Sequence, residues 1–153
     1  MDVVVISTGG TIASTADAHG ALVPTLSGDH LVSRCGTHRA VRAIDVASLD
    51  SSSMGLAEID MLRETVHATL LDADVTGIVI THGTDTMEET AYFLNLTVKS
   101  DKPVVLVANK AEGKHGEIGA MESYALGLGD PVQISAEHGE GMGDLHEALS
   151  ALV

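Results

Sequence analysis

Aromatic side chains and basic charge are both scarce in this chain of 153 residues. Only 2% of the residues are aromatic and tryptophan is absent, although 44% are hydrophobic, so the core must be built from Val, Ile, Leu, Ala and Met. Even so, a domain of this length buries roughly 70% of its unfolded surface. Eight Lys and Arg residues stand against 22 acidic ones, which gives a formal net charge of -14. Scattered basic residues argue against a nucleic-acid partner, and the acidity indicates a solvated surface.

Cysteine and long apolar runs are nearly absent as well. The single cysteine, Cys35, excludes an intramolecular disulfide. No apolar run approaches the roughly 20 residues of a membrane span, and the opening MDVVVIST lacks the basic leader of a secretion signal. The histidines show no ligand spacing, so we expect no metal and no other cofactor, with His82 a hydrogen-bonded residue at a strand end. These features fit a cytoplasmic or recombinant origin and no membrane partner.

Short apolar runs alternate with helical patterns along the whole chain. The strand candidates are DVVVIST, VRAIDVA, GIVITHG, PVVLVAN and PVQISAE. The helix candidates are a weak one over 27–34, then AEIDMLRETVHATLLDA, MEETAYFLNLTVK, GAMESYALGL and GMGDLHEALSAL. In AEIDMLRETVHATLLDA the apolar residues Ile59, Leu62, Val66 and Leu70 recur every three or four residues, which predicts one buried helix face.

This alternation predicts the fold class. Strands that are almost continuous in Val and Ile are covered on both faces, as in a parallel sheet. We therefore predict an α/β fold with three layers, in which a doubly wound five-stranded parallel sheet has the flavodoxin-like order 2-1-3-4-5. No linker interrupts the pattern, because KPVVLVANK is an ordinary buried strand. A single domain over 1–153 is expected.

Polar residues follow three of the predicted strands. Gly9-Gly10 allows a sharp turn after the first strand, and Thr11 follows it. The second strand delivers Asp50 and Ser51, and the third delivers Thr84 and Asp85. The carboxyl ends of these strands meet at the switch point where doubly wound folds bind ligands. A threonine hydroxyl needs a base or a neighbouring cation to act as a nucleophile there.

Residues from about 1 to 105 resemble the amino-terminal domain of bacterial-type L-asparaginases, through VVVISTGGTIAS, LDSSSM and ITHGTDTMEETAYFL. The resemblance implies that Thr11 attacks a substrate side-chain amide. It also implies that Thr84 and Asp85 are the second threonine and aspartate of the active site. Ser51, with Asp50 beside it, would hold the substrate's α-carboxylate. The implied ligand is therefore a small amide.

Parts of an asparaginase active site are nevertheless missing from the sequence. The family's catalytic lysine comes later in its chain, after this sequence has stopped resembling the family. The second domain, which completes the pocket from a neighbouring subunit, has no counterpart. The loop TADAHGALVPTLSGD also has no tyrosine, which the family usually has there. General-base and electrostatic contributions are each worth about 10²–10⁴-fold, so we expect a vestigial site.

Residues from about 106 to 153 resemble the end of the first GTPase domain of Der-type ribosome-assembly GTPases, through VANKAEG and ALGLGDPVQISAEHGEGMGDLHEAL. The resemblance implies a guanine site made by Asn109, Lys110, Glu112, Ser135 and Ala136. A carboxylate at Glu112 can accept both N–H protons of the guanine edge. No G-x-x-x-x-G-K-[ST] loop is present to hold phosphates and magnesium, so GTP hydrolysis is not expected.

We interpret the chain as an engineered chimera of two α/β fragments, joined near residues 101–107 and without evolved catalytic activity. Both parents present strands of the same pattern at that point, so the join preserves sheet spacing and crossover. One alternative is a residual L-asparaginase-type amidohydrolase that uses Thr11. A second is a weak guanine-nucleotide binding module. The oligomeric state is expected to be a monomer or a homodimer.

Overall fold

Four parallel strands form the centre of the fold in the computed structural model, which describes residues 2–10, 14–16, 18, 22–24, 27–34, 41–109, 133–134, 143 and 147. The sheet order is β4-β1-β5-β6-β7, and every pair of neighbours is parallel. The strands span Asp2–Gly9 (β1), Val41–Leu49 (β4), Val75–His82 (β5), Val104–Asn109 (β6) and Gln133–Ile134 (β7). The predicted order 2-1-3-4 is confirmed for the first four strands. The fifth is described over two residues only.

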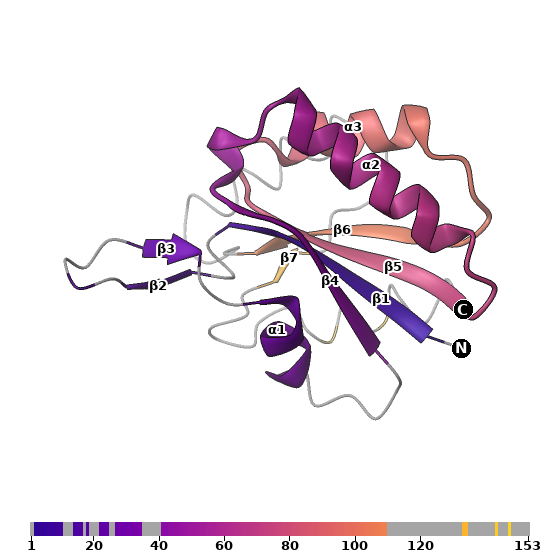
Figure 1. The fold of residues 1–153 in the computed structure, drawn as a ribbon, viewed down its shortest axis with the longest axis horizontal. Helices are drawn as coiled ribbons and strands as arrows, with labels where there is room; N and C mark the ends of the chain where they lie inside the picture. Colours follow the sequence, from indigo (N-terminus) through magenta and orange to yellow (C-terminus); the bar gives the residue numbers. More distant parts are fainter. Residues whose placement is uncertain are drawn as a thin grey trace.

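Helices cover both faces of this sheet, which confirms the layered α/β architecture. The short α1 (Gly28–Arg34) lies on one face, while α2 (Leu56–Leu70) and α3 (Met87–Thr97) lie side by side on the other (Figure 1). A single turn of 3-10 helix, η2 (Ser51–Ser53), separates β4 from α2. The two helices expected within 119–128 and 141–152 fall almost wholly outside the described residues.

The core between the sheet and the helices α2 and α3 is aliphatic, as the composition requires. It joins residues of β1, β5, α2 and α3, namely Val4, Ile6, Leu62, Val66, Val75, Ile78, Ile80 and Leu94. Leu62 and Val66 are 0% exposed, and Leu70 packs partly buried against the cluster, so the predicted apolar face of α2 is confirmed. Val4 and Ile6 pair with Ile78 and Ile80 across β1 and β5, so these side chains share one face of the sheet.

A hairpin between β1 and α1 was not predicted. Strands β2 (Ser14–Ala16) and β3 (Leu22–Pro24) pair antiparallel with Thr15 opposite Val23. Figure 1 shows the hairpin projecting beyond the carboxyl end of β1. The sequence had indicated only a loop here. Among the described residues, no helix has the length and apolar character needed to cross a membrane.

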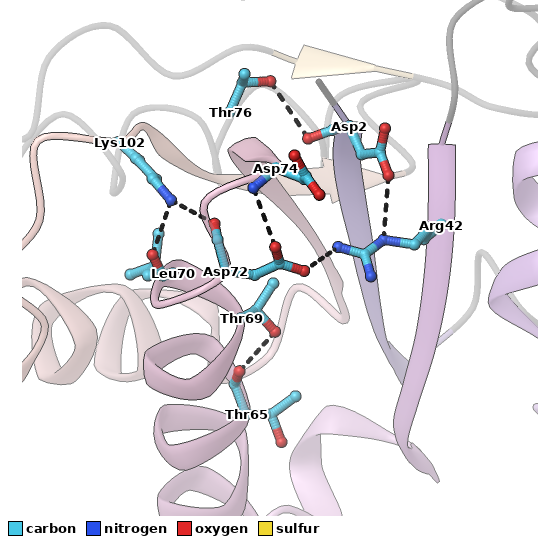
Figure 2. Close-up of polar contacts among 9 residues, drawn as sticks. All are labelled: Asp2, Arg42, Thr65, Thr69, Leu70, Asp72, Asp74, Thr76 and Lys102. Carbon is cyan, nitrogen blue, oxygen red and sulfur yellow. Dashed lines mark hydrogen bonds and ion pairs between the residues drawn. The ribbon is translucent and has the colours of Figure 1, made fainter.

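The amino edge of the sheet is held by a cluster of charged side chains (Figure 2). The Arg42 guanidinium donates to Asp72 Oδ2 at 2.7 Å, and its Nε lies 3.5 Å from Asp2 Oδ2. The hydrogen bond from Arg42, together with one from the Asp74 backbone, lowers the pKa of Asp72. Lys102 Nζ donates to the carbonyls of Leu70 at 2.8 Å and Asp72 at 2.7 Å, which satisfies the end of α2.

Candidate functional site

The turn after β1 is wedged between the ends of β4 and β5. Gly9 and Gly10 have φ of 98° and 74°, a region that disfavours other residues. The Gly10 N–H donates to the Leu49 carbonyl at 2.8 Å. A Cβ on Gly9 would lie 2.5 Å from the Leu49 nitrogen, and one on Gly10 would lie 2.9 Å from the Gly83 nitrogen. The sharp turn predicted from Gly9-Gly10 is therefore present, and the three strand ends meet in backbone contact.

Ser51 joins the end of β4 to the turn that follows β5. Its side chain is 2% exposed, and its Oγ accepts a hydrogen bond from the Asp85 N–H at 3.2 Å. The Ser51 carbonyl accepts a second hydrogen bond, from Thr86 Oγ1 at 3.0 Å. A Cβ on Gly83 would collide with the Ser51 side chain, so only glycine allows this approach. The structure thus brings two of the three polar segments together.

Around this junction, three of the predicted site residues have side chains exposed to solvent, namely Asp50, Thr84 and Asp85. Asp50 precedes η2, and its Oδ1 accepts a hydrogen bond from the Ser52 N–H at 3.4 Å. The exposed carboxylates and hydroxyl can bind an amine or amide group of a ligand. Thr11, the nucleophile that the resemblance implies, lies outside the described residues.

The residues predicted to bind guanine are almost all outside the described part. Asn109 ends β6, where its backbone pairs with Ile134 of β7. Lys110, Glu112, Ser135 and Ala136 are not described. Since Asn109 lies at the carboxyl end of β6, the guanine segment begins on the same edge of the sheet as the asparaginase-like residues. The guanine site itself stays a prediction.

His82 lies beneath the turn after β5, where it is 1% exposed. Its Nδ1 is 2.7 Å from the Gly83 carbonyl oxygen and its Nε2 is 3.1 Å from Thr90 Oγ1 on α3. The prediction of a hydrogen-bonded residue at the end of a strand is confirmed. Burial lowers the pKa of His82, which keeps the ring neutral at pH 7. No group of three His, Cys, Asp or Glu side chains suited to a metal occurs within the described ranges.

Sequence reasoning missed two hydroxyl groups that hold this region together. Thr86 donates to the Ser51 carbonyl, and Thr90 pairs with His82. Thr86 stands inside the HGTDT motif, and Thr90 is a fully buried polar residue in a helix whose other buried residue is Leu94. A threonine at the buried face of a predicted helix is a signal that could have identified Thr90, because buried hydroxyls require partners.

The lysines of the described segments lie away from the carboxyl edge. Lys102 binds carbonyls at the end of α2, and Lys99 Nζ donates to the Asn95 carbonyl at 3.1 Å, at the end of α3. Both sites belong to the amino edge of the sheet, because α2 and α3 run antiparallel to the strands (Figure 1). Neither lysine can therefore support Thr84 or Asp85. Within the described ranges, the carboxyl edge has the polar residues Asp50, Ser51, Thr84 and Asp85 but no lysine.

The fold is that of a doubly wound α/β domain with polar residues at the carboxyl ends of its parallel strands. The family model "Asparaginase, N-terminal" matches residues 2–121. The chain belongs to this family. It is similar to the thermostable L-asparaginase from Thermococcus kodakarensis, with 31% identity and a TM-score of 0.62 over 71% of this chain and 34% of that one. It is also similar to a probable cytoplasmic L-asparaginase from Campylobacter jejuni, with 41% identity and a TM-score of 0.58 over 70% and 32% of the two chains.

Similarity to a second family is also present, as the sequence predicted. GTPase Der from Bradyrhizobium sp. (strain ORS 278) is 53% identical over 110 residues, which are 72% of this chain and 24% of that protein. GTPase Der from Rhodopseudomonas palustris (strain TIE-1) gives the same identity over the same length. The chain spans about a quarter of the length of these relatives. The Der similarity is longer than the segment 106–153, so it overlaps the part that matches asparaginases.

Proposed function

We propose that the chain is an engineered chimera in which an asparaginase-like and a Der-like segment complete one sheet, without evolved turnover. The observation that carries the proposal is the pairing of β5 with β6. Residues Ile78–His82 pair in continuous register with Val104–Ala108, across the predicted join near residues 101–107. A splice that preserves the strand pattern and the crossover would give this pairing.

The proposal extends to the rest of the molecule. The Der-like segment supplies a full fifth strand beside β6, of which Gln133–Ile134 are the start of the pairing. The protein is cytoplasmic, binds no nucleic acid, and is a monomer or a homodimer. Sedimentation equilibrium across a tenfold range of concentration distinguishes the two states.

Ammonia release from L-asparagine tests the absence of turnover. The purified chain and its Thr11→Ala variant are assayed side by side, at matched concentration and with folding verified by circular dichroism. Equal rates, both at the level of buffer, are expected if the site is vestigial. A rate of ammonia release by the unchanged chain that exceeds the rate of Thr11→Ala would contradict the proposal.

The second candidate function is a residual L-asparaginase-type amidohydrolase. It is supported by the hydrogen bonds of Ser51 to Asp85 and Thr86, which hold two parts of the edge in a fixed relation. Residual activity that requires this arrangement should fall in Ser51→Ala. The neighbouring Ser53→Ala is the matched control, since the Ser53 side chain is exposed. Activity that is unchanged in Ser51→Ala would argue against this candidate.

Guanine binding is the remaining alternative. The residues predicted to contact guanine lie outside the described part of the chain, apart from the backbone of Asn109, so guanine binding has the least support. Calorimetry with GDP and with guanosine at millimolar concentration tests it, because base contacts alone rarely give tight affinity. Absence of heat would exclude this binding.

A further inference from the structure

The loop that carries Thr84 and Asp85 is bridged at its base by one buried imidazole. The loop runs from Gly83 to Thr86 and joins β5 to α3. The His82 ring touches both sides of it, through the Gly83 carbonyl at 2.7 Å and Thr90 Oγ1 at 3.1 Å. It therefore ties the start of the loop to the first turns of α3.

These two hydrogen bonds determine which nitrogen of His82 carries the proton. The Gly83 carbonyl can only accept, so Nδ1 must be the donor. The lone pair on Nε2 is then free to accept the hydroxyl proton of Thr90. A neutral imidazole satisfies both partners, and burial, which lowers the pKa of His82, favours the same state.

Few charged groups surround the ring in the part of the chain that is described. The charge of Glu89, in the first turn of α3, raises the pKa of His82 and so opposes the effect of burial, but the Glu89 side chain is exposed. On β6, the residue whose backbone pairs with His82 is Ala108. On β1, the hydroxyl of Thr8 donates to the Thr81 carbonyl. Asp50 and Asp85, on the adjoining loops, are exposed to solvent. A charged imidazole would therefore have no buried counter-ion among these groups.

We propose that His82 and Thr90 are positioning residues that hold the loop Gly83–Thr86 only while the imidazole is neutral. Protonation places a hydrogen on Nε2, so the Thr90 hydroxyl must turn from donor to acceptor and its own proton loses the imidazole as its partner. It also leaves a charge in a desolvated site, and movement of the ring and loop toward water relieves that cost. The loop then withdraws the Asp85 N–H from Ser51 Oγ, now at 3.2 Å. The inference goes beyond the proposed function and holds with or without turnover.

Hydrogen exchange at the Asp85 amide tests this proposal directly, because that N–H reports the junction with Ser51. Protection, corrected for intrinsic exchange, should fall about tenfold as the pH is lowered from about 7.5 to about 5. An amide inside α2, such as that of Ile59, should show a smaller change. Nitrogen chemical shifts of the His82 ring, recorded on the same samples, follow its tautomer and its titration.

Three variants of α3 separate positioning from general stability. Thr90→Val keeps the shape of the side chain and should reduce the protection of Asp85 at neutral pH, while Thr90→Ser should restore it. Thr97→Val is the matched control, because the Thr97 hydroxyl donates only to the Phe93 carbonyl within the same helix. Protection at Asp85 that is equal in Thr90→Val and the parent, or constant while the His82 ring titrates, would overturn the proposal. No activity is measured, so this test is independent of turnover.

Discussion

At the scale of single residues, the carboxyl edge depends on glycines that admit no side chain. Gly9 has a left-handed φ, and an added Cβ would meet the backbone of Leu49. Gly9→Ala should lower the free energy of unfolding by about 1–3 kcal/mol, since such backbone strain costs that much. Gly55→Ala is the matched control, because its Cβ would meet only the flexible end of Glu58 at 3.2 Å. Urea denaturation measures both, and equal effects of the two substitutions would contradict this account.

The buried imidazole of His82 makes stability depend on pH. Its pKa is lowered in the folded state from an ordinary value of 6.5, so the unfolded chain binds the proton more tightly. The contribution to stability is fully present above pH 6.5 and is lost as the pH falls through the folded pKa. His82→Gln should remove this dependence, while His67→Gln, at an exposed position of α2, should not. Urea midpoints of the parent, His82→Gln and His67→Gln are measured between about pH 7.5 and 5. Curves of midpoint against pH that are parallel for all three proteins would argue against a contribution from His82.

The residues of the edge were predictable from sequence to different degrees. Ser51 and Asp85 stand in the short turns that follow β4 and β5, so their convergence follows from the parallel topology. The bonds made by Thr86 and Thr90 depend on how closely two loops approach, and strand periodicity does not determine that distance. The Gly83 backbone allows the approach, and a sequence pattern shows only that glycine is present.

At the scale of elements, Lys102 ties the end of α2 to the start of β6. Its two charge-assisted hydrogen bonds satisfy carbonyls that the helix leaves free, and its charge complements the helix dipole. Lys102→Met should lower the free energy of unfolding by about 1–3 kcal/mol. Lys99→Met should cost less than about 0.5 kcal/mol, because Lys99 is exposed and bonds only within its own helix end. Thermal and urea denaturation test the difference, and similar losses would refute it.

The elements themselves were largely predictable. Val and Ile runs predicted β1, β4, β5 and β6, and the three-to-four spacing of apolar residues predicted α2. The hairpin of β2 and β3 escaped because strands of three residues contain too little alternation to be recognised.

At the scale of the whole molecule, the sheet continues through residues 101–107, where the sequence predicted the join of the two segments. The Ile78 N–H donates to the Pro103 carbonyl at 2.9 Å, and the pairing of β5 with β6 continues from there. Limited proteolysis should therefore spare residues 103–109 while cutting exposed loops elsewhere. A stable amino-terminal fragment released by cleavage in that range would show that the carboxyl-terminal segment is not part of the same core. Mass spectrometry of the fragments identifies the sites.

Native-state hydrogen exchange across β1, β5, β6 and β7 tests the central claim most directly, namely that both segments share one cooperative sheet. The amides of Ile80, Leu106 and Ile134 sample β5, β6 and β7. With increasing denaturant, the opening free energies of Ile80 and Leu106 should converge on a single global value, and Ile134 should join them. Amides of β1 and β5 that stay protected while those of β6 and β7 exchange freely would contradict the account.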